Sequence, residues 1–432
     1  MTGRRQWSIF EYGYLVSEKD SGRVKDATEL PPTCFEWLEQ CCLKDDAEYD
    51  QRLLTLKTAG RVKVLQVKNY VGVIALPGGA FIEVLPKTDH DNAREQLVMM
   101  LRTLKTFRHI ATTSASIKAS RMPLMDIFIH QFIVSVQAIL QQGLKRDYLR
   151  QQDNLPWMKG KLQVSAQLSR NSVRRDRFQV EYDEYSVNRL ENRLLKTAID
   201  KVSRLTRNPQ LIQQLRPLQS AFEGILPVVD TAHTFDQVRL DRHMNHYEQA
   251  LEWAKLILCG ESPLCMQGHA NAISLLFPME AVFESFVAAW MRYHHHQRYQ
   301  IDTQAKTHSL ARYHTKNIFR LKPDIWLRPY ETSKYSSIIC DTKWKKIKPN
   351  KPGFNISQSD LYQMQAYGVK YLDSQGDMIL IYPEYDGFNY ALPHPFELHK
   401  PDCHALRLWI VPFAIGTSIQ NSKLILPETL RL

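Results

Sequence analysis

The chain has 432 residues, 44% of them hydrophobic, which is enough for two or three domains with a sizeable core. Its 56 Lys and Arg outweigh its 45 Asp and Glu, and the formal net charge of +11 favours a polyanionic partner, nucleic acid first. The seven cysteines are scattered without a C-x-x-C pair, the N-terminus lacks a signal sequence, and no apolar run reaches the length of a membrane span. These features exclude a disulfide framework, a cysteine zinc site and a membrane protein, and a cytoplasmic protein is expected.

Residues 1–110 predict a β-rich domain, a candidate for docking a partner. The stretch 7–12 predicts a first strand, and the apolar spacing of 35–43 predicts a helix. Three short apolar runs with turn residues between them predict a meander. Its strands are expected at 62–67, 71–76 and 81–85.

Residues 111–262 predict a mostly helical, basic region. The apolar period predicts its helices at 125–142, 186–205, 211–218 and 239–258. Residues 101–220 contain 21 Lys and Arg against 9 Asp and Glu, so this segment carries as much charge as the whole chain. Such a local concentration is typical of a nucleic-acid-binding surface. Arg174, Arg175 and Arg177 are its DNA-binding candidates.

Residues 263–432 predict a compact α/β domain with a mixed central sheet, which makes the chain an α+β multidomain protein. Gly and Pro residues at 260–263 indicate the boundary that precedes it. The predicted elements are helices at 278–293 and 357–371 and strands at 298–305, 317–327, 336–343, 377–382 and 405–411.

Two acidic residues and a lysine fall at the ends of predicted strands in this domain. Residues i and i+2 of a strand point to the same side, so Asp341 and Lys343 share a face. If the strand after Asp324 pairs with the strand of Asp341, the two carboxylates stand side by side. Two carboxylates and an ammonium suit Mg²⁺-dependent phosphodiester hydrolysis, since the carboxylates hold the ion and the lysine steadies the attacking hydroxide. The simpler alternative is a surface ion pair between Asp341 and Lys343.

The helix before these strands offers a third carboxylate. Glu280 and Glu284 lie on one helical stripe at i, i+4, next to the apolar face. A Glu buried there needs a partner, and a metal shared with Asp324 and Asp341 would provide one. Glu280 fits the alternative better, because a first-turn Glu is favoured by the helix dipole. We therefore expect Glu284 to be the site carboxylate.

The segment after Lys343 offers supporting groups. Gln363 and Tyr367 are i, i+4 on a predicted helix, where they either orient Lys343 and the substrate or belong to an ordinary amphipathic helix. Lys345, Lys346 and Lys348 follow the catalytic strand, and both a phosphate-binding groove and a solvated loop remain open for them.

This ordered set resembles the PD-(D/E)xK nuclease superfamily, in its branch with a Q-x-x-x-Y helix. Further motifs narrow the resemblance to the McrC family, the nuclease subunit of McrBC modification-dependent restriction systems. They are Val71-Gly72-Val73-Ile74, Ile82-Glu83-Val84-Leu85-Pro86-Lys87, Gly143-Leu144-x-x-x-Tyr148, Lys159-Gly160-Lys161-Leu162, Tyr182-Asp183-Glu184, Asn192-Arg193-Leu194-Leu195-Lys196, Phe277-Pro278-Met279-Glu280-x-x-Phe283-Glu284 and Asp341-Thr342-Lys343-Trp344-Lys345. The first fifty residues, the tail after about residue 400 and the long 324–341 spacing depart from the pattern.

The resemblance implies an endonuclease that works with a motor. McrC-like chains bind no nucleotide themselves, insert a β-rich region into the ring of a hexameric AAA+ GTPase of McrB type, and stimulate its hydrolysis. That partner reads 5-methylcytosine and translocates double-stranded DNA, and the McrC-like chain cuts it with Mg²⁺ or, alternatively, Mn²⁺. In agreement, the sequence contains no G-x-x-x-x-G-K-[ST] phosphate loop.

Two other functions stay open at this point. One is a repair-type nuclease of the same superfamily that acts without a motor. The other is a non-catalytic activator or adaptor of an AAA+ motor whose nuclease domain only binds DNA. The acidic pair argues against the second, because a pure DNA-binding surface gains nothing from carboxylates that face phosphates.

Overall fold

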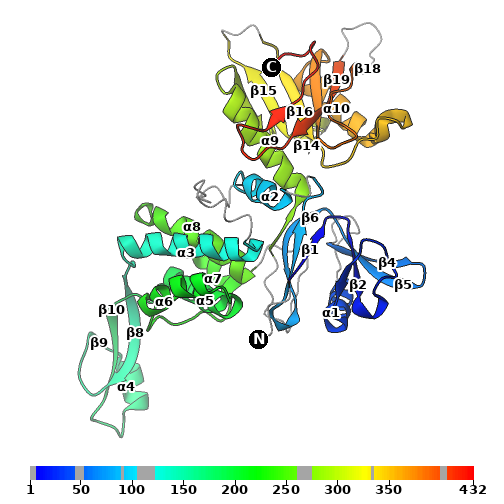
Figure 1. Ribbon diagram of the computed structural model, residues 1–432. Coiled ribbons are helices and arrows are strands. Elements are labelled where there is room, and N and C mark those ends of the chain that lie inside the picture. Colours follow the sequence, from blue (N-terminus) through cyan, green and yellow to red (C-terminus); the bar gives the residue numbers. More distant parts are fainter. Residues whose placement is uncertain are drawn as a thin grey trace. The chain divides into compact units, whose positions relative to one another are not determined.

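The computed structural model describes residues 6–43, 53–88, 92–104, 122–259, 275–331, 335–398 and 406–432. The chain divides into two compact units (Figure 1). One comprises mainly residues 111–261, and the other comprises mainly residues 5–110 and 276–432. Residues 1–110 and 263–432, which the sequence predicts as separate domains, therefore contribute to the same unit.

The N-terminal part of the larger unit contains two four-stranded sheets. The first has the order β1-β7-β6-β11, and its strands are β1 (Gln6–Phe10), β7 (Phe81–Leu85), β6 (Tyr70–Ala75) and β11 (Leu275–Pro278). The second has the order β3-β2-β5-β4, and its strands are β3 (Thr28–Leu30), β2 (Tyr14–Ser17), β5 (Val62–Val67) and β4 (Leu54–Ala59). Helix α1 (Pro32–Leu43) contributes Phe35 and Leu38 to the shared apolar core.

The predicted meander is wrong, although its three strands exist. The strands β6 and β7 form an antiparallel hairpin around the turn Pro77–Gly79, but β5 pairs with β2 and β4 in the other sheet. Every residue of β6 is buried, so this strand needs cover on both faces and lies inside the core. The alternation of apolar residues predicts where strands occur, but it does not predict which strands pair with each other.

The smaller unit is built on a bundle of helices. They are α3 (Leu124–Gln142), α5 (Leu190–Leu205), α6 (Pro209–Ala221), α7 (Thr231–Gln237) and α8 (Asn245–Cys259). By length and composition α3 is able to cross a membrane, the only such helix in the described part of the chain, but 67% of that stretch is buried, as in the core helix of a bundle. The predicted helices 186–205 and 239–258 begin later than expected, at Leu190 and Asn245.

An arm of three strands and a short helix extends from this bundle, so the region predicted as mostly helical is helical apart from these strands (Figure 1). Its elements are β8 (Asp147–Leu155), β9 (Lys161–Leu162), α4 (Val164–Arg170) and β10 (Phe178–Ser186). Polar residues predominate in β8, so it lacks the apolar alternation by which strands are predicted.

The C-terminal part of the larger unit is a mixed sheet with the order β12-β15-β16-β17-β19-β18, and β20 pairs with β19. Its strands are β12 (Tyr299–Thr303), β15 (Ile325–Pro329), β16 (Ile338–Thr342), β17 (Gly376–Pro383), β18 (Phe396–Leu398), β19 (Leu406–Ala414) and β20 (Lys423–Leu424). The predicted strand 317–327 divides in two, because β14 (Lys316–Arg320) forms a hairpin with β13 (Ser309–Tyr313) before the chain enters β15.

Two helices pack on the opposite faces of this sheet. Alternate residues of its central strands, such as Leu408 and Ile410, share a core with Met364 and Tyr367 of α10 (Gln358–Tyr371). Phe413, at the other parity of β19, contacts Phe283 and Phe286 of α9 (Met279–His295). The sheet is therefore covered on both sides, and polar groups gather where its strands end.

Candidate catalytic site

The two predicted aspartates meet at one edge of the mixed sheet. Strands β15 and β16 are antiparallel, with Ile325 opposite Cys340, so the start of β15 lies beside the end of β16. Asp324, just before β15, and Asp341, within β16, are therefore neighbours. The backbone N–H and the hydroxyl of Thr342 both donate to Asp324 Oδ2, each at 2.8 Å. Thr342 is a site residue that the sequence prediction missed.

Lys343 lies on the same face as Asp341, as strand alternation predicts. Its Nζ is 2.5 Å from Asp341 Oδ2 and donates to Gln363 Oε1 at 3.1 Å. Gln363 Nε2 in turn donates to the hydroxyl of Tyr367 at 2.7 Å, and that hydroxyl donates to the carbonyl of Lys322 at 2.9 Å. Gln363 and Tyr367 of α10 thus form a chain of hydrogen bonds that ends on the ammonium group of Lys343. The ring of Tyr367 also packs in the core.

The structure separates the two glutamates of α9. Glu280 is exposed in the first turn of the helix, where the dipole accounts for it. Glu284 is half-buried, and its Oε1 accepts a hydrogen bond from Gln304 Nε2 at 2.7 Å. Burial, with the charge of Asp324 adding to it, raises the pKa of Glu284 to about 7. Glu284 therefore belongs electrostatically to the aspartate pair.

Burial also raises the pKa values of both aspartates. Asp341 is 1% exposed, and burial together with the nearby Asp324 raises its pKa to about 7 even though Lys343 opposes the shift. The pKa of Asp324 is raised by burial as well, against the hydrogen bonds from Thr342. Burial lowers the pKa of Lys343, but the neighbouring carboxylates Asp341, Asp324 and Asp360 together outweigh burial and raise the pKa. Three carboxyl groups with raised pKa values near one lysine are a cluster that gains from a further cation.

The donor set fits a magnesium ion. Asp341 Oδ1 is buried and has no hydrogen-bond partner within the described chain, so it is available as a ligand. Carboxylate oxygens are the ligands that Mg²⁺ prefers, and this ion commonly takes only one or two of them and completes its shell with water and phosphate. No group of three or more His, Cys, Asp and Glu residues among the described positions is arranged to hold a metal. Asp324 and Asp341 could hold such an ion together, whereas Glu284, the third predicted ligand, does not form a three-residue metal group with them in the described part of the chain.

The family was decided by comparison with known proteins. A model of the "McrBC 5-methylcytosine restriction system component" family matches residues 65–383, well over half of the chain. The chain belongs to this family. No match was found among curated proteins.

The chain is also similar to solved structures, and the first of these shares its fold. A chain of the refined half-complex of Thermococcus gammatolerans McrB AAA+ hexamers with bound McrC is 17% identical, with a TM-score of 0.63 and 95% of each chain covered. A chain of the Thermococcus gammatolerans McrBC complex is 20% identical, with a TM-score of 0.46, over 65% of this chain and 85% of that one.

The motifs shared with the McrC family in the smaller unit are structural. Gly160 has a positive φ of 71°, and a Cβ there would lie 2.4 Å from the carbonyl oxygen of Glu181, so the loop packs against β10 only with glycine. Asn192 is fully buried at the root of the arm, where it donates to the carbonyls of Lys145 and Val187. These residues hold the arm in shape and carry no chemistry of their own.

The predicted DNA-binding residues fall in two places. Arg174 and Arg175 are exposed on the arm, whereas Arg177 donates to the carbonyl of Asn154 at 2.9 Å and is part of the arm's structure. The lysines that follow the catalytic strand are exposed around the buried Ile347; they are Lys345, Lys346 and Lys348.

Two of these lysines border a cavity of about 310 Å³ beside the carboxyl ends of β16 and β17. Lys345 and Lys346 line it together with Lys87. Lys345 also approaches Asp360 at 3.5 Å, and Asp360 is 4.0 Å from Lys343. Asp360, in the first turn of α10, therefore lies between Lys345 and Lys343, a contact that the sequence prediction missed.

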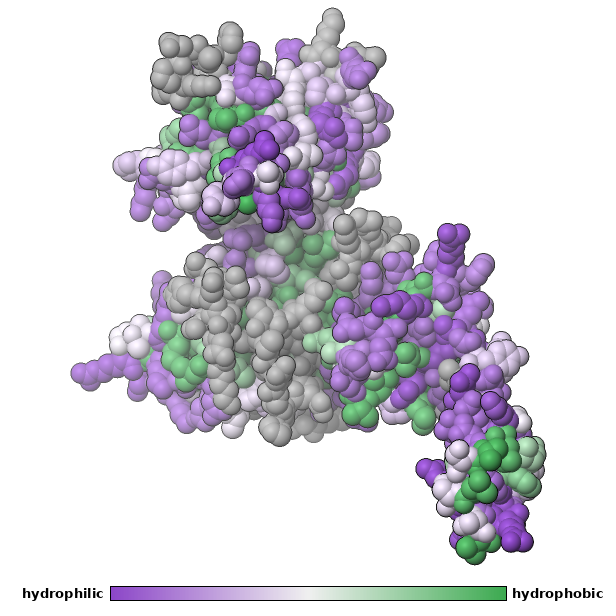
Figure 2. Space-filling view, turned by 180° about the vertical axis from the view of Figure 1, so that it is seen from behind, coloured by the Kyte–Doolittle hydropathy of each residue, from purple (hydrophilic) through white to green (hydrophobic). Residues whose placement is uncertain are grey.

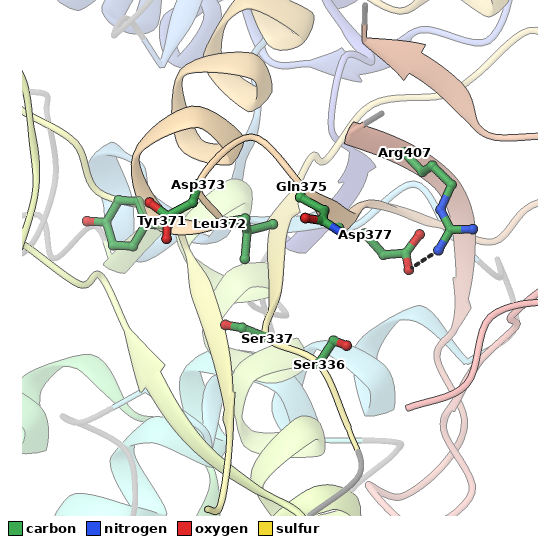
Figure 3. Close-up of a pocket in the computed structure, with 9 residues that line it drawn as sticks. Ser336, Ser337, Tyr371, Leu372, Asp373, Gln375, Asp377 and Arg407 are labelled. Atoms are coloured by element: carbon green, nitrogen blue, oxygen red, sulfur yellow. Dashed lines mark hydrogen bonds and ion pairs between the residues drawn. The ribbon is translucent and has the colours of Figure 1, made fainter. Parts of the chain in front are cut away.

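A wider cavity, of about 680 Å³, lies at the other ends of the same strands (Figure 3). Two acidic residues, Asp373 and Asp377, line it, and Asp377 accepts hydrogen bonds from Arg407 at 2.7 Å and from the indole of Trp409 at 2.8 Å. Tyr371, also on its wall, donates to the carbonyl of Ala305 at 2.8 Å. Asp377 and Tyr371 are therefore held in structural hydrogen bonds, and the cluster of Asp324, Asp341 and Lys343 lies at the opposite edge.

Proposed function

We propose that this chain is the Mg²⁺-dependent DNA endonuclease subunit of a McrBC-like restriction system, with a PD-(D/E)xK nuclease domain that cuts DNA containing 5-methylcytosine. The observation that carries the proposal is the buried cluster of Asp324, Asp341 and Lys343 at one sheet edge, in a chain of the McrBC family. Glu284 and the Gln363–Tyr367 pair complete it.

Each residue of the cluster has a distinct role in this proposal. An ion held by Asp324 and Asp341 would polarise the scissile phosphate and lower the pKa of a water molecule. Thr342 fixes the orientation of Asp324, and Gln363 fixes the ammonium of Lys343, which stabilises the negative charge of the attacking oxygen and of the phosphate. Glu284 is placed to hold a water molecule or to take up a proton at the ion.

An AAA+ partner of McrB type follows from the family and from the fold shared with McrC bound to McrB hexamers. We propose that the partner supplies GTP hydrolysis and DNA translocation and that this chain stimulates the hydrolysis. We take the arm as the candidate docking element in place of residues 1–110, which the sequence analysis favours, because apolar side chains gather on the arm (Figure 2). The exposed apolar residues of the arm are Tyr148, Trp157, Met158, Val164, Leu168, Val173 and Tyr185. Such a patch is typical of an interaction surface.

Cleavage of methylated plasmid with the partner, GTP and Mg²⁺ tests this function. We expect Asp341→Ala and Lys343→Ala each to lower the rate by at least about 100-fold, with partner binding and GTPase stimulation unchanged. Glu280→Gln is the matched control, because Glu280 is an exposed carboxylate on the same helix as Glu284. Cleavage by Asp341→Ala at the wild-type rate would refute the assignment of the site.

A non-catalytic activator of the motor is the second candidate. It is favoured by the direct contact of Lys343 with Asp341 and by the lack of a three-ligand group among the described residues. Restriction that survives Asp324→Ala combined with Asp341→Ala would support it. Nicking of plasmid by the purified chain with Mg²⁺ and no partner would instead support a repair-type nuclease.

A further inference from the structure

Trp344 connects the two elements that carry the proposed catalytic groups. It directly follows Lys343, whose N–H continues the parallel ladder by donating to the carbonyl of Ile381 at 2.9 Å. Because side chains alternate along this extended segment, Lys343 faces α10 and Trp344 faces α9. The indole is 6% exposed, and its ring centroid is 5.1 Å from that of Phe283, the residue before Glu284. A displacement of Trp344 therefore moves both Lys343 and the helix of Glu284.

The indole is held from its other side by Glu11, which lies 333 residues earlier in the chain. Glu11 Oε1 accepts a hydrogen bond from Trp344 Nε1 at 2.7 Å and another from the backbone N–H of Lys87 at 2.9 Å. The N–H of Glu11 donates to the carbonyl of Leu85, also at 2.9 Å. One buried carboxyl group thus joins the ends of β1 and β7 to the catalytic strand.

The burial of the Glu11 carboxyl group costs free energy, because its surroundings satisfy it only in part. It is 1% exposed, and Oε2 has no hydrogen-bond partner within the described residues. Burial raises its pKa to about 7, against the hydrogen bonds from Lys87 and Trp344. The charged groups around it are Lys87 and Lys346, and Lys345 and Glu384 line the adjacent cavity. An apolar residue would fill the same space at lower cost, so the hydrogen bond to the indole is the feature to explain.

We propose that Glu11 and Trp344 are positioning residues, which set the placement of Lys343 and Glu284 from the N-terminal sheet. The inference rests on the proposed nuclease function and adds a regulatory connection to it. The contact makes the catalytic geometry depend on where β1 and β7 lie. A partner that shifts these strands would therefore change the rate of cutting without touching DNA or metal.

Variants that break or keep this hydrogen bond provide the test. Trp344→Phe keeps an aromatic ring against Phe283 and removes the N–H donor, Glu11→Ala removes the acceptor, and Glu11→Gln retains an acceptor oxygen. We expect Trp344→Phe and Glu11→Ala to lower the single-turnover cleavage rate at saturating DNA by about 10- to 100-fold, since small misplacements of catalytic groups have effects of this size. Glu11→Gln should restore most of the rate, and the double variant should be no slower than Glu11→Ala.

Trp409→Phe is the matched control. Its indole also donates to a carboxylate, the half-buried Asp377, at 2.8 Å in the same sheet, but at the edge away from the proposed catalytic cluster. The two Trp→Phe variants should show similar losses of thermal stability and unchanged DNA affinity, while only Trp344→Phe loses cleavage. Equal cleavage rates for both variants, or a double variant whose rate loss is the product of the single losses, would overturn the proposal. If the wild type itself shows no metal-dependent cleavage, the proposed function has failed instead.

Discussion

Glu284→Gln should stabilise the protein and disable it at the same time. With its pKa at about 7 instead of 4.5, the carboxylate form of Glu284 is disfavoured in the folded state. At about 1.4 kcal/mol per unit of pKa, the difference between these two pKa values corresponds to roughly 3 kcal/mol. Screening by solvent reduces this cost to about 1–2 kcal/mol, because the group is partly exposed. Glutamine carries no charge and still accepts the hydrogen bond from Gln304, so the substitution should recover this free energy of unfolding.

The pH dependence follows from the direction of the shift. Because the folded-state pKa is raised above the unfolded value, ionisation of Glu284 destabilises the fold fully above pH 7, and the effect vanishes below about pH 4.5. The gain from Glu284→Gln should therefore be complete at pH 8 and absent at pH 4. Thermal unfolding with EDTA at both pH values measures it, and we expect an increase in Tm of about 2–4 °C per kcal/mol at the higher pH.

Function should change in the opposite direction. Loss of the site carboxylate should lower the cleavage rate at least about 100-fold, and Mg²⁺ should raise the Tm of the wild type more than that of Glu284→Gln. Glu280→Gln is the matched control and should change neither quantity. A Glu284→Gln variant that is less stable than the wild type at pH 8, or equally stabilised at both pH values, would refute the electrostatic reasoning.

The other predictions concern the groups around the aspartates and the arm. Thr342→Val removes one of the two hydrogen bonds to Asp324 Oδ2, so the cleavage rate should fall about 10-fold and the free energy of unfolding should fall by about 1–3 kcal/mol. Thr342→Ser keeps the hydroxyl, so its cleavage rate and its free energy of unfolding should stay near those of the wild type. Gln363→Leu leaves the ammonium of Lys343 without its amide acceptor and should slow single-turnover cleavage about 10-fold without changing DNA affinity, which filter binding checks. Lys346→Ala should leave cleavage at saturating DNA unchanged but reduce the salt dependence of DNA binding by about one ion, and an unchanged salt slope would remove Lys346 from the DNA contacts. Gly160→Ala forces a Cβ to within 2.4 Å of a backbone oxygen, so it should weaken partner binding and lower partner-dependent cleavage; unaltered partner binding would argue against the arm as the docking element.

The candidate site could be predicted from the sequence because its geometry is mostly local. Strand alternation puts Asp341 and Lys343 on one face, and helical spacing puts Gln363 and Tyr367 together; the structure shows both relations. The register of two short antiparallel strands then brings in Asp324. Each of these relations depends on a few residues in regular secondary structure.

The features that the sequence did not reveal depend on distant contacts. Gln304 lies at a turn before the β13–β14 hairpin and reaches Glu284 only in three dimensions. Glu11 has no motif at all, and its contact with Trp344 requires the N-terminal strands to pack beside the last sheet. The pairing of β5 with β2 was missed for a similar reason, because β2 lies far earlier in the chain. The mixed sheet itself was predicted, but the division of strand 317–327 was not.

The larger unit is built from two separate chain segments, and the ribosome makes these segments at different times. The smaller unit is inserted between the two segments of the larger one, so a ribosome completes residues 111–261 before it reaches the catalytic strands. At about 5–20 residues per second, Glu11 emerges roughly half a minute before its indole partner exists. A nascent or prematurely terminated chain thus has a complete N-terminal part without an assembled cutting centre, and we expect a chain that stops at residue 356 to leave DNA intact in a nicking assay.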